Sequence, residues 1–254
     1  MMIPKNVFIT GTSSGLGKGL AEALLAEGYC VYGCSRRGSQ LTGNIKDIQC
    51  DLTCFDEISQ ALEQLLGEIK TLDLVILNAG ILGELKSMRE TSLDELQQIM
   101  NISVWSNKFI LDWLLQSNIA VKQILLMSSG AAVLGNKGWG GYALSKSALN
   151  MLGRLYAHEF PDTHITSIAP GIVTSKMMDY LCNEADSDKF PALKRIQQAR
   201  HDGKILSPRE AAARILTALP YLSDYESGSF IDLRQILAPE EYAELMQARN
   251  TPAL

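Results

Sequence analysis

Short apolar runs rich in β-branched residues alternate along this chain with longer segments of helical period. This alternation is typical of a parallel sheet whose strands are joined by helices. The apolar runs are nearly continuous, as expected for strands that are buried on both faces. The predicted strands are Asn6 to Thr10, Cys30 to Ser35, Ile48 to Asp51, Leu72 to Asn78, Gln123 to Ser128, His164 to Ala169 and Ser229 to Asp232.

The segments between these strands predict helices, some of which have recognisable ends. Ser92 with Glu95 resembles a capping box, and Ser207 precedes Pro208 as a cap residue precedes a helix-starting proline. The sequence therefore predicts an α/β fold, a Rossmann-like doubly wound sheet of seven parallel strands with helices on both faces. The predicted helices are Leu16 to Glu27, Phe55 to Glu68, Ser92 to Gln116, Tyr142 to Phe160 and Pro208 to Leu219.

The 254 residues contain no linker rich in Pro, Gly or Ser, which predicts a single domain over residues 1–254. One segment, residues 175–203, fits the pattern less well because it mixes Met177, Tyr180 and Phe190 with charges. It follows the sixth predicted strand, where a substrate lid would lie; a surface helical hairpin is the alternative.

The composition argues against several kinds of partner. A net charge of −5 with 20% charged residues gives no basic stripe for nucleic acid. No apolar stretch reaches the length of about 20 residues that spans a bilayer, and Met1 to Lys5 begin no signal-peptide core, so we expect a cytoplasmic protein without membrane contact. The five cysteines form no CxxC pair and the three histidines lack metal-ligand spacing, which predicts reduced thiols and no metal site.

The first predicted strand ends in a glycine-rich turn, Thr10-Gly11-Thr12-Ser13-Ser14-Gly15-Leu16-Gly17, and a helix follows at once. Glycines at such a turn let the backbone approach a pyrophosphate, whose charge meets the positive end of the helix. The spacing differs from the common G-x-G-x-x-G fingerprint, and no Walker ending is present. We expect a dinucleotide to lie against Gly11, Ser13, Ser14, Gly15, Leu16 and Gly17.

Tyr142 and Lys146 are four residues apart and share one face of a predicted helix. A tyrosine has a pKa of about 10, and a neighbouring ammonium lowers it, which makes the phenol a usable general acid or base. The same spacing also occurs on solvated helix faces, so the pair indicates catalysis only together with the other motifs in the chain.

Six motifs in order give the chain a resemblance to the short-chain dehydrogenase/reductase family. The order and spacing of these motifs match the family over almost the whole chain. The motifs are the glycine-rich turn, Asn78-Ala79-Gly80, Asn101, Ser128-Ser129, Tyr142-x-x-x-Lys146 and Pro170-Gly171. Within the family, Lys137-Gly138-Trp139 is similar to sepiapterin and benzil reductases, which reduce carbonyl and dicarbonyl compounds with NADPH.

The resemblance implies four catalytic residues. Tyr142 would donate its proton to the carbonyl oxygen as hydride reaches the carbon, and Lys146 would lower the pKa of the tyrosine and bind the nicotinamide ribose. Ser129 would bind the substrate oxygen, whereas Ser128 would be structural. Asn101 would hold the water that links Lys146 to solvent.

The end of the second predicted strand indicates the cofactor. NAD-preferring relatives have an acidic residue there, whereas this chain has Ser35-Arg36-Arg37, whose guanidinium groups favour a 2'-phosphate. This predicts NADP(H), and two solvated surface arginines are the alternative. The resemblance further implies cofactor contacts from Asp51, Leu52, Asn78, Ala79, Gly80, Tyr142, Lys146, Pro170, Gly171, Val173 and Ser175.

The leading hypothesis is an NADPH-dependent enzyme that reduces a ketone or diketone beneath residues 175–203. A sensor or scaffold that binds NADP without turnover is the alternative from another class, although such proteins usually lack the tyrosine or the lysine. A serine hydrolase is disfavoured because Ser129 lies in no G-x-S-x-G elbow. The resemblance also implies a homodimer or homotetramer through the helices Ser92 to Gln116 and Tyr142 to Phe160, where Ala148 and Gly153 would permit close approach.

Overall fold

The computed structural model describes residues 5–250, so Met1 to Pro4, in which we expect no signal-peptide core, lie outside the described residues. Seven strands of the described chain form one parallel sheet in the order β3-β2-β1-β5-β7-β8-β9, which confirms the predicted fold class. The strands are β1 (Asn6–Thr10), β2 (Cys30–Ser35), β3 (Ile45–Gln49), β5 (Leu74–Leu77), β7 (Gln123–Met127), β8 (His164–Ala169) and β9 (Ser229–Asp232).

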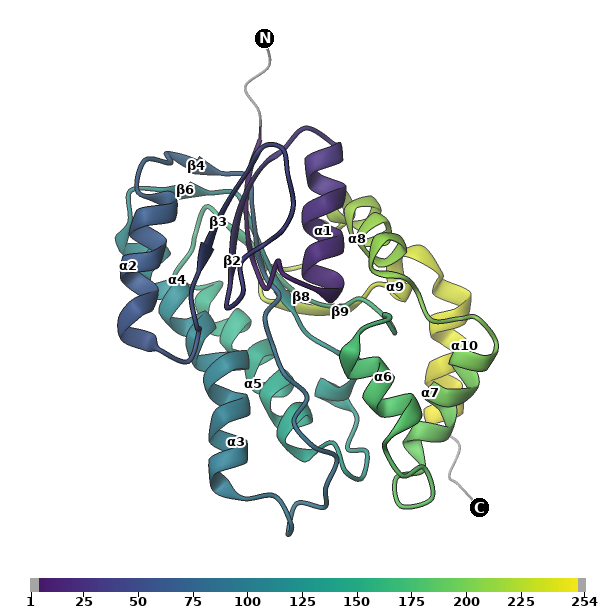
Figure 1. Ribbon diagram of the computed structural model, residues 1–254. Coiled ribbons are helices and arrows are strands. Elements are labelled where there is room, and N and C mark those ends of the chain that lie inside the picture. Colours follow the sequence, from purple (N-terminus) through teal and green to yellow (C-terminus); the bar gives the residue numbers. More distant parts are fainter. Residues whose placement is uncertain (1–4, 251–254) are drawn as a thin grey trace.

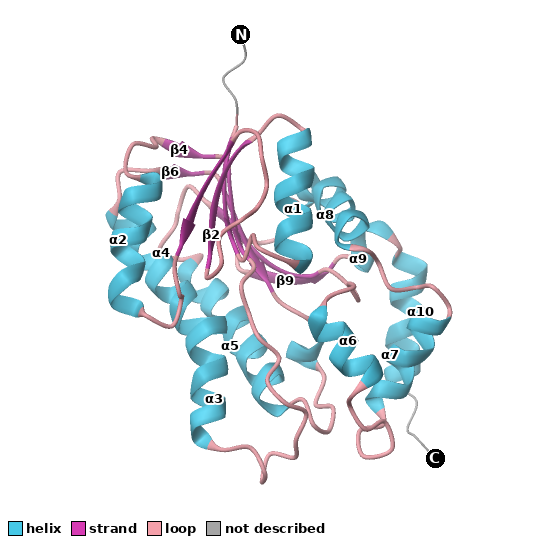
Figure 2. Cartoon of the chain, in the orientation of Figure 1, coloured by secondary structure: helices cyan, strands magenta, loops and turns pink. Residues whose placement is uncertain are grey.

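Helices cover both faces of this sheet (Figures 1 and 2). Side chains of β1 alternate between the two faces: Val7 and Ile9 are fully buried in one core, and Phe8 is fully buried in the other. The helices over the first core are α1 (Gly15–Ala26) and α8 (Pro208–Leu222), and those over the second are α2 (Phe55–Leu66), α4 (Ser106–Gln116) and α5 (Gly140–Tyr156).

The direction of winding reverses at β1, because β2 lies on one side of it and β5 on the other. In a doubly wound sheet this switch point leaves a crevice outside the carboxyl ends of the strands, where ligands bind. The glycine-rich turn follows β1, and the Asn78 and Ser129 motifs follow β5 and β7. The fold therefore brings these motifs to one edge of the sheet.

The third strand lies at Ile45–Gln49, whereas the sequence predicts Ile48 to Asp51. β3 is an edge strand and is only partly buried, so it lacks the continuous apolar run that marks the inner strands. The predicted boundary followed apolarity and was therefore wrong here.

The predicted strand Leu72 to Asn78 is interrupted at Asp73. The Asp73 carboxylate accepts hydrogen bonds from the Asn6 N–H at 2.8 Å and from the Lys122 ammonium at 2.7 Å. The residues before it form β4 (Thr71–Leu72), which pairs with β6 (Ala120–Val121) in a separate two-stranded sheet.

The predicted helix Ser92 to Gln116 is divided into α3 (Leu93–Met100) and α4 by a π-helical turn, η1 (Asn101–Trp105). Its capping box is confirmed: the Glu95 N–H donates to Ser92 Oγ at 3.2 Å, and Glu95 Oε2 accepts from the Ser92 N–H at 2.9 Å. Ser207 caps α8 in the same way, with Pro208 in its first turn.

Residues 175–203 contain two helices, α6 (Lys176–Asn183) and α7 (Ala192–His201), in agreement with the helical hairpin that the sequence left open as the alternative. Beyond β9 the chain continues into α9 (Arg234–Leu237) and α10 (Pro239–Asn250), which the sequence did not predict. None of the helices within residues 5–250 is long and apolar enough to cross a membrane.

Gly153 does not serve the role expected of it at an interface between subunits. A Cβ at this position would lie 2.5 Å from Leu126 Cδ1 and 3.1 Å from Ser167 Oγ, so Gly153 faces the sheet. The small residue lets α5 approach its own sheet closely.

Candidate active site

A cavity of about 990 Å³ lies at the carboxyl edge of the sheet and is lined by residues that follow β1, β2, β5, β7 and β8. Among the predicted site residues, Gly17 and Asn101 do not line it. The predicted residues that do are Gly11, Ser13, Ser14, Gly15, Leu16, Ser35, Arg36, Arg37, Asp51, Leu52, Asn78, Ala79, Gly80, Ser129, Tyr142, Lys146, Pro170, Gly171, Val173 and Ser175.

The glycine-rich turn packs closely because two of its glycines adopt left-handed conformations. Gly11 has a φ of 83° and Gly15 a φ of 57°, which favour glycine. A Cβ on Gly17 would lie 2.3 Å from the Gly11 carbonyl oxygen, so Gly17 supports the turn from beneath the cavity. Ser14 is the N-cap of α1 and makes no side-chain cap bond, which leaves backbone N–H groups of the helix end for an anion.

The end of β5 is joined to this turn by three hydrogen bonds. Thr10 Oγ1 accepts from the Asn78 and Ala79 N–H groups at 3.0 Å each, and Asn78 Nδ2 donates to the Thr10 carbonyl at 3.0 Å. A Cβ on Gly80 would lie 3.2 Å from Lys146 Nζ. Glycine at position 80 therefore leaves room for the amine beside the cavity wall.

The end of β2 presents a donor set that suits an anion. Ser35 Oγ is buried and has no hydrogen-bond partner among the described residues. Arg36 and Arg37 follow it as exposed residues, and Arg37 Nη2 donates to Ser14 Oγ at 3.3 Å. Across the cavity, hydrogen bonds from the Thr53 backbone chiefly hold the pKa of Asp51 below its usual value, and the positive Arg36 contributes.

Tyr142 and Lys146 lie one turn apart near the start of α5 and face the cavity, as the spacing predicts. Ser129 lies beside Tyr142 in the cavity, where its hydroxyl can donate to the phenol oxygen and so favours the ionised tyrosine. The Lys146 ammonium lies 5.7 Å from the centroid of the Tyr142 ring and donates to the Met127 carbonyl at 2.7 Å. The Met127 carbonyl was not predicted, because a backbone acceptor leaves no mark in the sequence.

Burial dominates the electrostatics of this pair. Desolvation raises the pKa of Tyr142, and the hydrogen bond with Ser129 acts in the opposite direction. The same cause lowers the pKa of Lys146 to about 8. The expectation that the tyrosine pKa is lowered is therefore not met without bound cofactor, because burial outweighs any effect of the amine.

Asn101 is the first residue of the π turn η1, which packs against α5. Its Oδ1 accepts a 2.6 Å hydrogen bond from Gln97 Nε2. The π turn inserts an extra residue into the helix, a distortion that is frequent at functional sites. Asn101 lies outside the wall of the cavity.

A third apolar cluster, here called the roof cluster, lies over the Tyr142 end of the cavity and is built largely from α6 and α7. The ring of Trp139 is 6.1 Å from the ring of Tyr142, and Met177 packs at its margin. Its buried members are Leu82, Leu85, Ala131, Trp139, Met178, Leu181, Phe190, Leu193 and Ile196.

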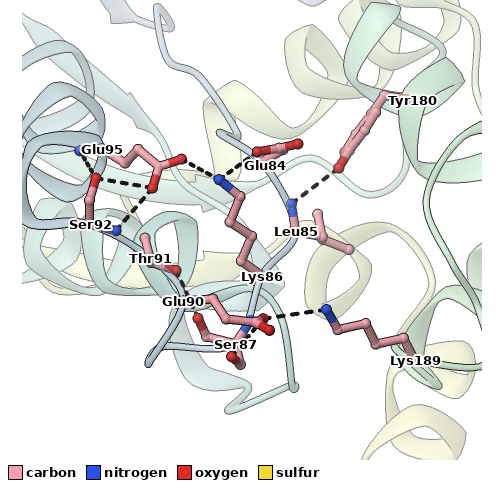
Figure 3. A network of polar contacts seen from close by, with 10 residues as sticks. All are labelled: Glu84, Leu85, Lys86, Ser87, Glu90, Thr91, Ser92, Glu95, Tyr180 and Lys189. Atoms are coloured by element: carbon pink, nitrogen blue, oxygen red, sulfur yellow. Dashed lines mark hydrogen bonds and ion pairs between the residues drawn. The ribbon is translucent and has the colours of Figure 1, made fainter.

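Polar contacts join the loop between β5 and α3 to the segment that carries α6 and α7 (Figure 3). Tyr180 Oη on α6 accepts a 3.2 Å hydrogen bond from the Leu85 N–H. Lys189, between α6 and α7, lies 3.3 Å from the Glu90 carboxylate. Residues 175–203 are therefore a pair of helices docked on that loop over the cavity.

Several cavity residues were missed at the sequence level. They lie on β2, after β3 and β8, on α6, α7 and α8, and in the segment after β9, where no motif marks them. Within residues 5–250 there is no cluster of three or more His, Cys, Asp and Glu side chains that could hold a metal ion. The missed lining residues include Cys34, Cys50, Ile172, Leu181, Arg195, Ile196, Arg214, Leu233 and Arg234.

Known proteins share the sequence pattern of this chain. The pattern that defines the family "short chain dehydrogenase" matches residues 5–186. Benzil reductase ((S)-benzoin forming) of Bacillus subtilis (strain 168) is 29% identical over 242 residues, which cover 90% of this chain and 98% of that protein. The benzil reductase IRC24 of Saccharomyces cerevisiae is 28% identical over 235 residues, covering 82% and 88% of the two chains.

Solved structures share the fold. The crystal structure of the KRED1-Pglu enzyme superimposes with a TM-score of 0.76 at 25% identity and covers 89% of this chain and all of its own. A short chain dehydrogenase/reductase from Saccharomyces cerevisiae gives a TM-score of 0.78 at 21% identity, covering 90% and 96% of the two chains.

Proposed function

This chain belongs to the short-chain dehydrogenase family, and from that premise we propose that it is an NADPH-dependent carbonyl reductase that converts a ketone or diketone to an alcohol. Membership makes it an NAD(P)-dependent oxidoreductase. The observation that carries the proposal is that Tyr142, Ser129 and Lys146 line the same cavity as the glycine-rich turn, with Lys146 one turn of α5 from Tyr142. Relatives named for the reduction of benzil, a diketone, support the substrate class.

Each catalytic residue of this chain has a separate role in the reduction. NADPH, when bound, supplies the hydride. The Ser129 hydroxyl donates a hydrogen bond to the carbonyl oxygen and stabilises the negative charge that develops there. The Tyr142 hydroxyl donates its proton to the same oxygen. Lys146, protonated below its pKa of about 8, favours the phenolate that remains and binds the nicotinamide ribose.

Proton resupply is assigned to Asn101. The π turn at Asn101 packs against α5, which carries Lys146. A water held by its side chain would connect the amine to solvent, because Lys146 itself is only 4% exposed. Gln97, which now donates to Asn101 Oδ1, would keep the amide oriented.

The cofactor would extend along the cavity from the end of β2 to the end of β8. Gly11, Ser13, Ser14, Gly15 and Leu16 would face its phosphates, because the amides of a helix end bind anions. The orphaned Ser35 hydroxyl and the two arginines after it would bind the 2'-phosphate. The adenine would contact Asp51 and Leu52, and the nicotinamide half would contact Asn78, Ala79, Gly80, Pro170, Gly171, Val173 and Ser175.

The 175–203 segment is proposed as the substrate lid. The roof cluster gives an apolar ceiling above Tyr142, which suits a carbonyl compound with an apolar or aromatic body. Within the described residues, polar contacts join the segment to the opposite loop at two places, Tyr180 with Leu85 and Lys189 with Glu90. A segment held in this way can open to admit substrate.

Oxidation of NADPH with a panel of ketones and diketones, together with identification of the alcohol, tests this proposal. We expect diketones to be reduced and NADH to be a poorer donor. The alternative, an NADP-binding protein without turnover, requires tight binding of NADPH with no alcohol formed from any carbonyl compound. That result would overturn the proposed function.

A further inference from the structure

Asp47, on β3, lies outside the cavity wall but binds both segments that shape its adenosine end. Its Oδ1 accepts a 2.6 Å hydrogen bond from Thr12 Oγ1, in the glycine-rich turn. Its Oδ2 accepts a 2.7 Å hydrogen bond from the Ser39 N–H. Ser39 ends the loop of residues 36–39, here called the arginine loop, which contains Arg36 and Arg37. One carboxylate therefore joins the phosphate-binding turn to the arginine loop.

The sequence of β2 makes room for this carboxylate. Gly33 lies opposite Asp47 in the register of β2 and β3. A Cβ on Gly33 would lie 2.1 Å from Asp47 Oδ1 and 3.0 Å from Thr12 Oγ1. Glycine in the interior of a strand is unfavourable unless another group approaches closely. The Asp47 side chain is that group, which explains the glycine in this buried strand.

The other contacts of the arginine loop are weaker. Gln49 Nε2 donates to the Arg37 carbonyl at 3.3 Å, and Arg37 Nη2 donates to Ser14 Oγ at 3.3 Å. Both lie at exposed positions. The bond from the Ser39 N–H to Asp47 is shorter, at 2.7 Å, and charge-assisted, a class that is stronger than neutral hydrogen bonds. Asp47 therefore contributes most to the order of the loop.

We infer that Asp47 is a positioning residue that sets the cofactor preference without touching the cofactor. Its carboxylate holds the arginine loop so that Arg36 and Arg37 face a 2'-phosphate bound above the end of β2. A loop that is already ordered loses less conformational freedom on binding, which favours the phosphorylated cofactor. This inference rests on the proposed use of NADPH.

The substitution Asp47→Asn tests it, because the amide keeps one acceptor oxygen and loses the other. Calorimetric titration measures the affinities for NADPH and NADH without turnover. We expect the dissociation constant of NADPH to rise about tenfold, equal to about 1.4 kcal/mol, while that of NADH changes less than about twofold. Charge alone predicts the opposite sign, because removal of a negative charge near a phosphate tightens binding. Tighter or unchanged binding of NADPH would overturn the inference.

A second variant removes the donor of the hydrogen bond between Ser39 and Asp47 instead of altering the acceptor. Ser39→Pro removes the backbone donor and leaves the charge of Asp47 in place, so the same selective loss of NADPH affinity is expected. Asp56→Asn, at an exposed position on α2, is the matched control for the change in charge and should alter neither affinity. A Ser39→Pro protein that folds and keeps the full preference for NADPH would count against Asp47.

The route through the arginines is tested by a double-mutant comparison. In a protein that carries Arg36→Ala and Arg37→Ala, the further change Asp47→Asn should leave the affinity for NADPH nearly unaltered. A second, fully additive loss would mean that Asp47 acts by another route. If the unaltered protein binds NADH as tightly as NADPH, the proposed function fails; if it prefers NADPH and Asp47→Asn keeps that preference, only this inference fails.

Discussion

The Lys146 ammonium donates a 2.7 Å hydrogen bond to the carbonyl of Met127, the last residue of β7. The bond fixes the amine at the edge of the sheet, one turn along α5 from Tyr142. Because the amine is buried, its pKa falls to about 8, so it still carries a proton at neutral pH. The native state therefore holds a charge in a poorly solvated place, which costs stability.

Lys146→Met should stabilise the protein near neutral pH while it abolishes efficient reduction. A lysine titrates near 10.4 in an unfolded chain and near 8 here, so the unfolded state binds more protons between these values and stability rises with pH across that window. Below pH 8 the full cost is present. After allowance for the lost hydrogen bond, we expect the variant to gain about 1 to 2 kcal/mol at pH 7.

Denaturant unfolding of the two proteins from pH 7 to pH 10 measures this difference. The gain should shrink as pH rises from about 8, because the lysine then loses its proton in the native state and the cost of the buried charge disappears, while the unfolded chain stays protonated. A variant that is less stable than the parent by the same amount at every pH would show that the buried charge carries no cost. NADPH affinity should also fall, through loss of the ribose contact.

Tyr142→Phe should remove turnover and leave the cofactor site intact. General acid catalysis contributes roughly 100- to 10,000-fold, and Ser129 cannot both hold the oxygen and supply the proton. The ring keeps its packing, so we expect stability to change by about 1 kcal/mol at most. Product analysis and NADPH titration check both parts. Reduction of diketones at close to the parent rate would refute the assignment of Tyr142 as the proton donor.

Replacing Arg36 and Arg37 by alanine should raise the Michaelis constant for NADPH much more than that for NADH. Charge-assisted bonds to a 2'-phosphate are lost, which corresponds to about 2 kcal/mol or more. Steady-state kinetics with the two cofactors measure the ratio. Arg154→Ala, an exposed position on α5, is the control for lost charge. Equal effects on both cofactors would mean that the two arginines are only solvated surface residues.

Tyr180→Phe should loosen the 175–203 segment selectively. The substitution removes the acceptor of the Leu85 N–H, so this amide should exchange faster with solvent. The Michaelis constant of the carbonyl substrate should change, while the affinity for NADPH stays constant. Met177→Ala, a separate change on the cavity wall, should shift the substrate preference of the enzyme. Tyr221→Phe, at an exposed position on α8, is the control. A matching loss of NADPH affinity would assign the segment to the dinucleotide site.

The protein should form a dimer or tetramer through α4 and α5. Leu144, Met151 and Leu155 are 52%, 52% and 55% exposed and share one face of α5, and Trp105 and Phe109 add exposed rings beside α4. Light scattering should give a multiple of 27.8 kDa, and Leu155→Arg should reduce it to the monomer. Tyr221→Arg, at an exposed site on α8 outside the predicted interface helices, should not. A 27.8 kDa particle for the unaltered protein at micromolar concentration would contradict this.

Boundaries were predictable where a strand is buried on both faces. β1, β2 and β8 lie where the sequence predicts them, because their apolar runs are bounded by polar or glycine residues, and the partly buried edge strand β9 does so too. The edge strand β3 and the break at Asp73 were not predictable, since the partial exposure of β3 and the two partners of the partly buried Asp73 carboxylate are decided by neighbouring segments. The same applies to α6 and α7, whose apolar residues become a core only against Leu82, Leu85 and Trp139.

The candidate site also contains features that the local sequence predicts and features that depend on tertiary contacts. Glycine at positions 11 and 15, the four-residue spacing of Tyr142 and Lys146, and the two arginines after β2 are local facts, because each depends on a turn or on one helical period. The sequence by itself therefore determined the fold class, and the residues that it predicted for the site line the cavity, except Gly17 and Asn101. Only the tertiary structure decided that the Met127 carbonyl binds Lys146 and that Asp47 joins Thr12 to Ser39, because burial and hydrogen-bond partners depend on segments that meet only in the folded chain.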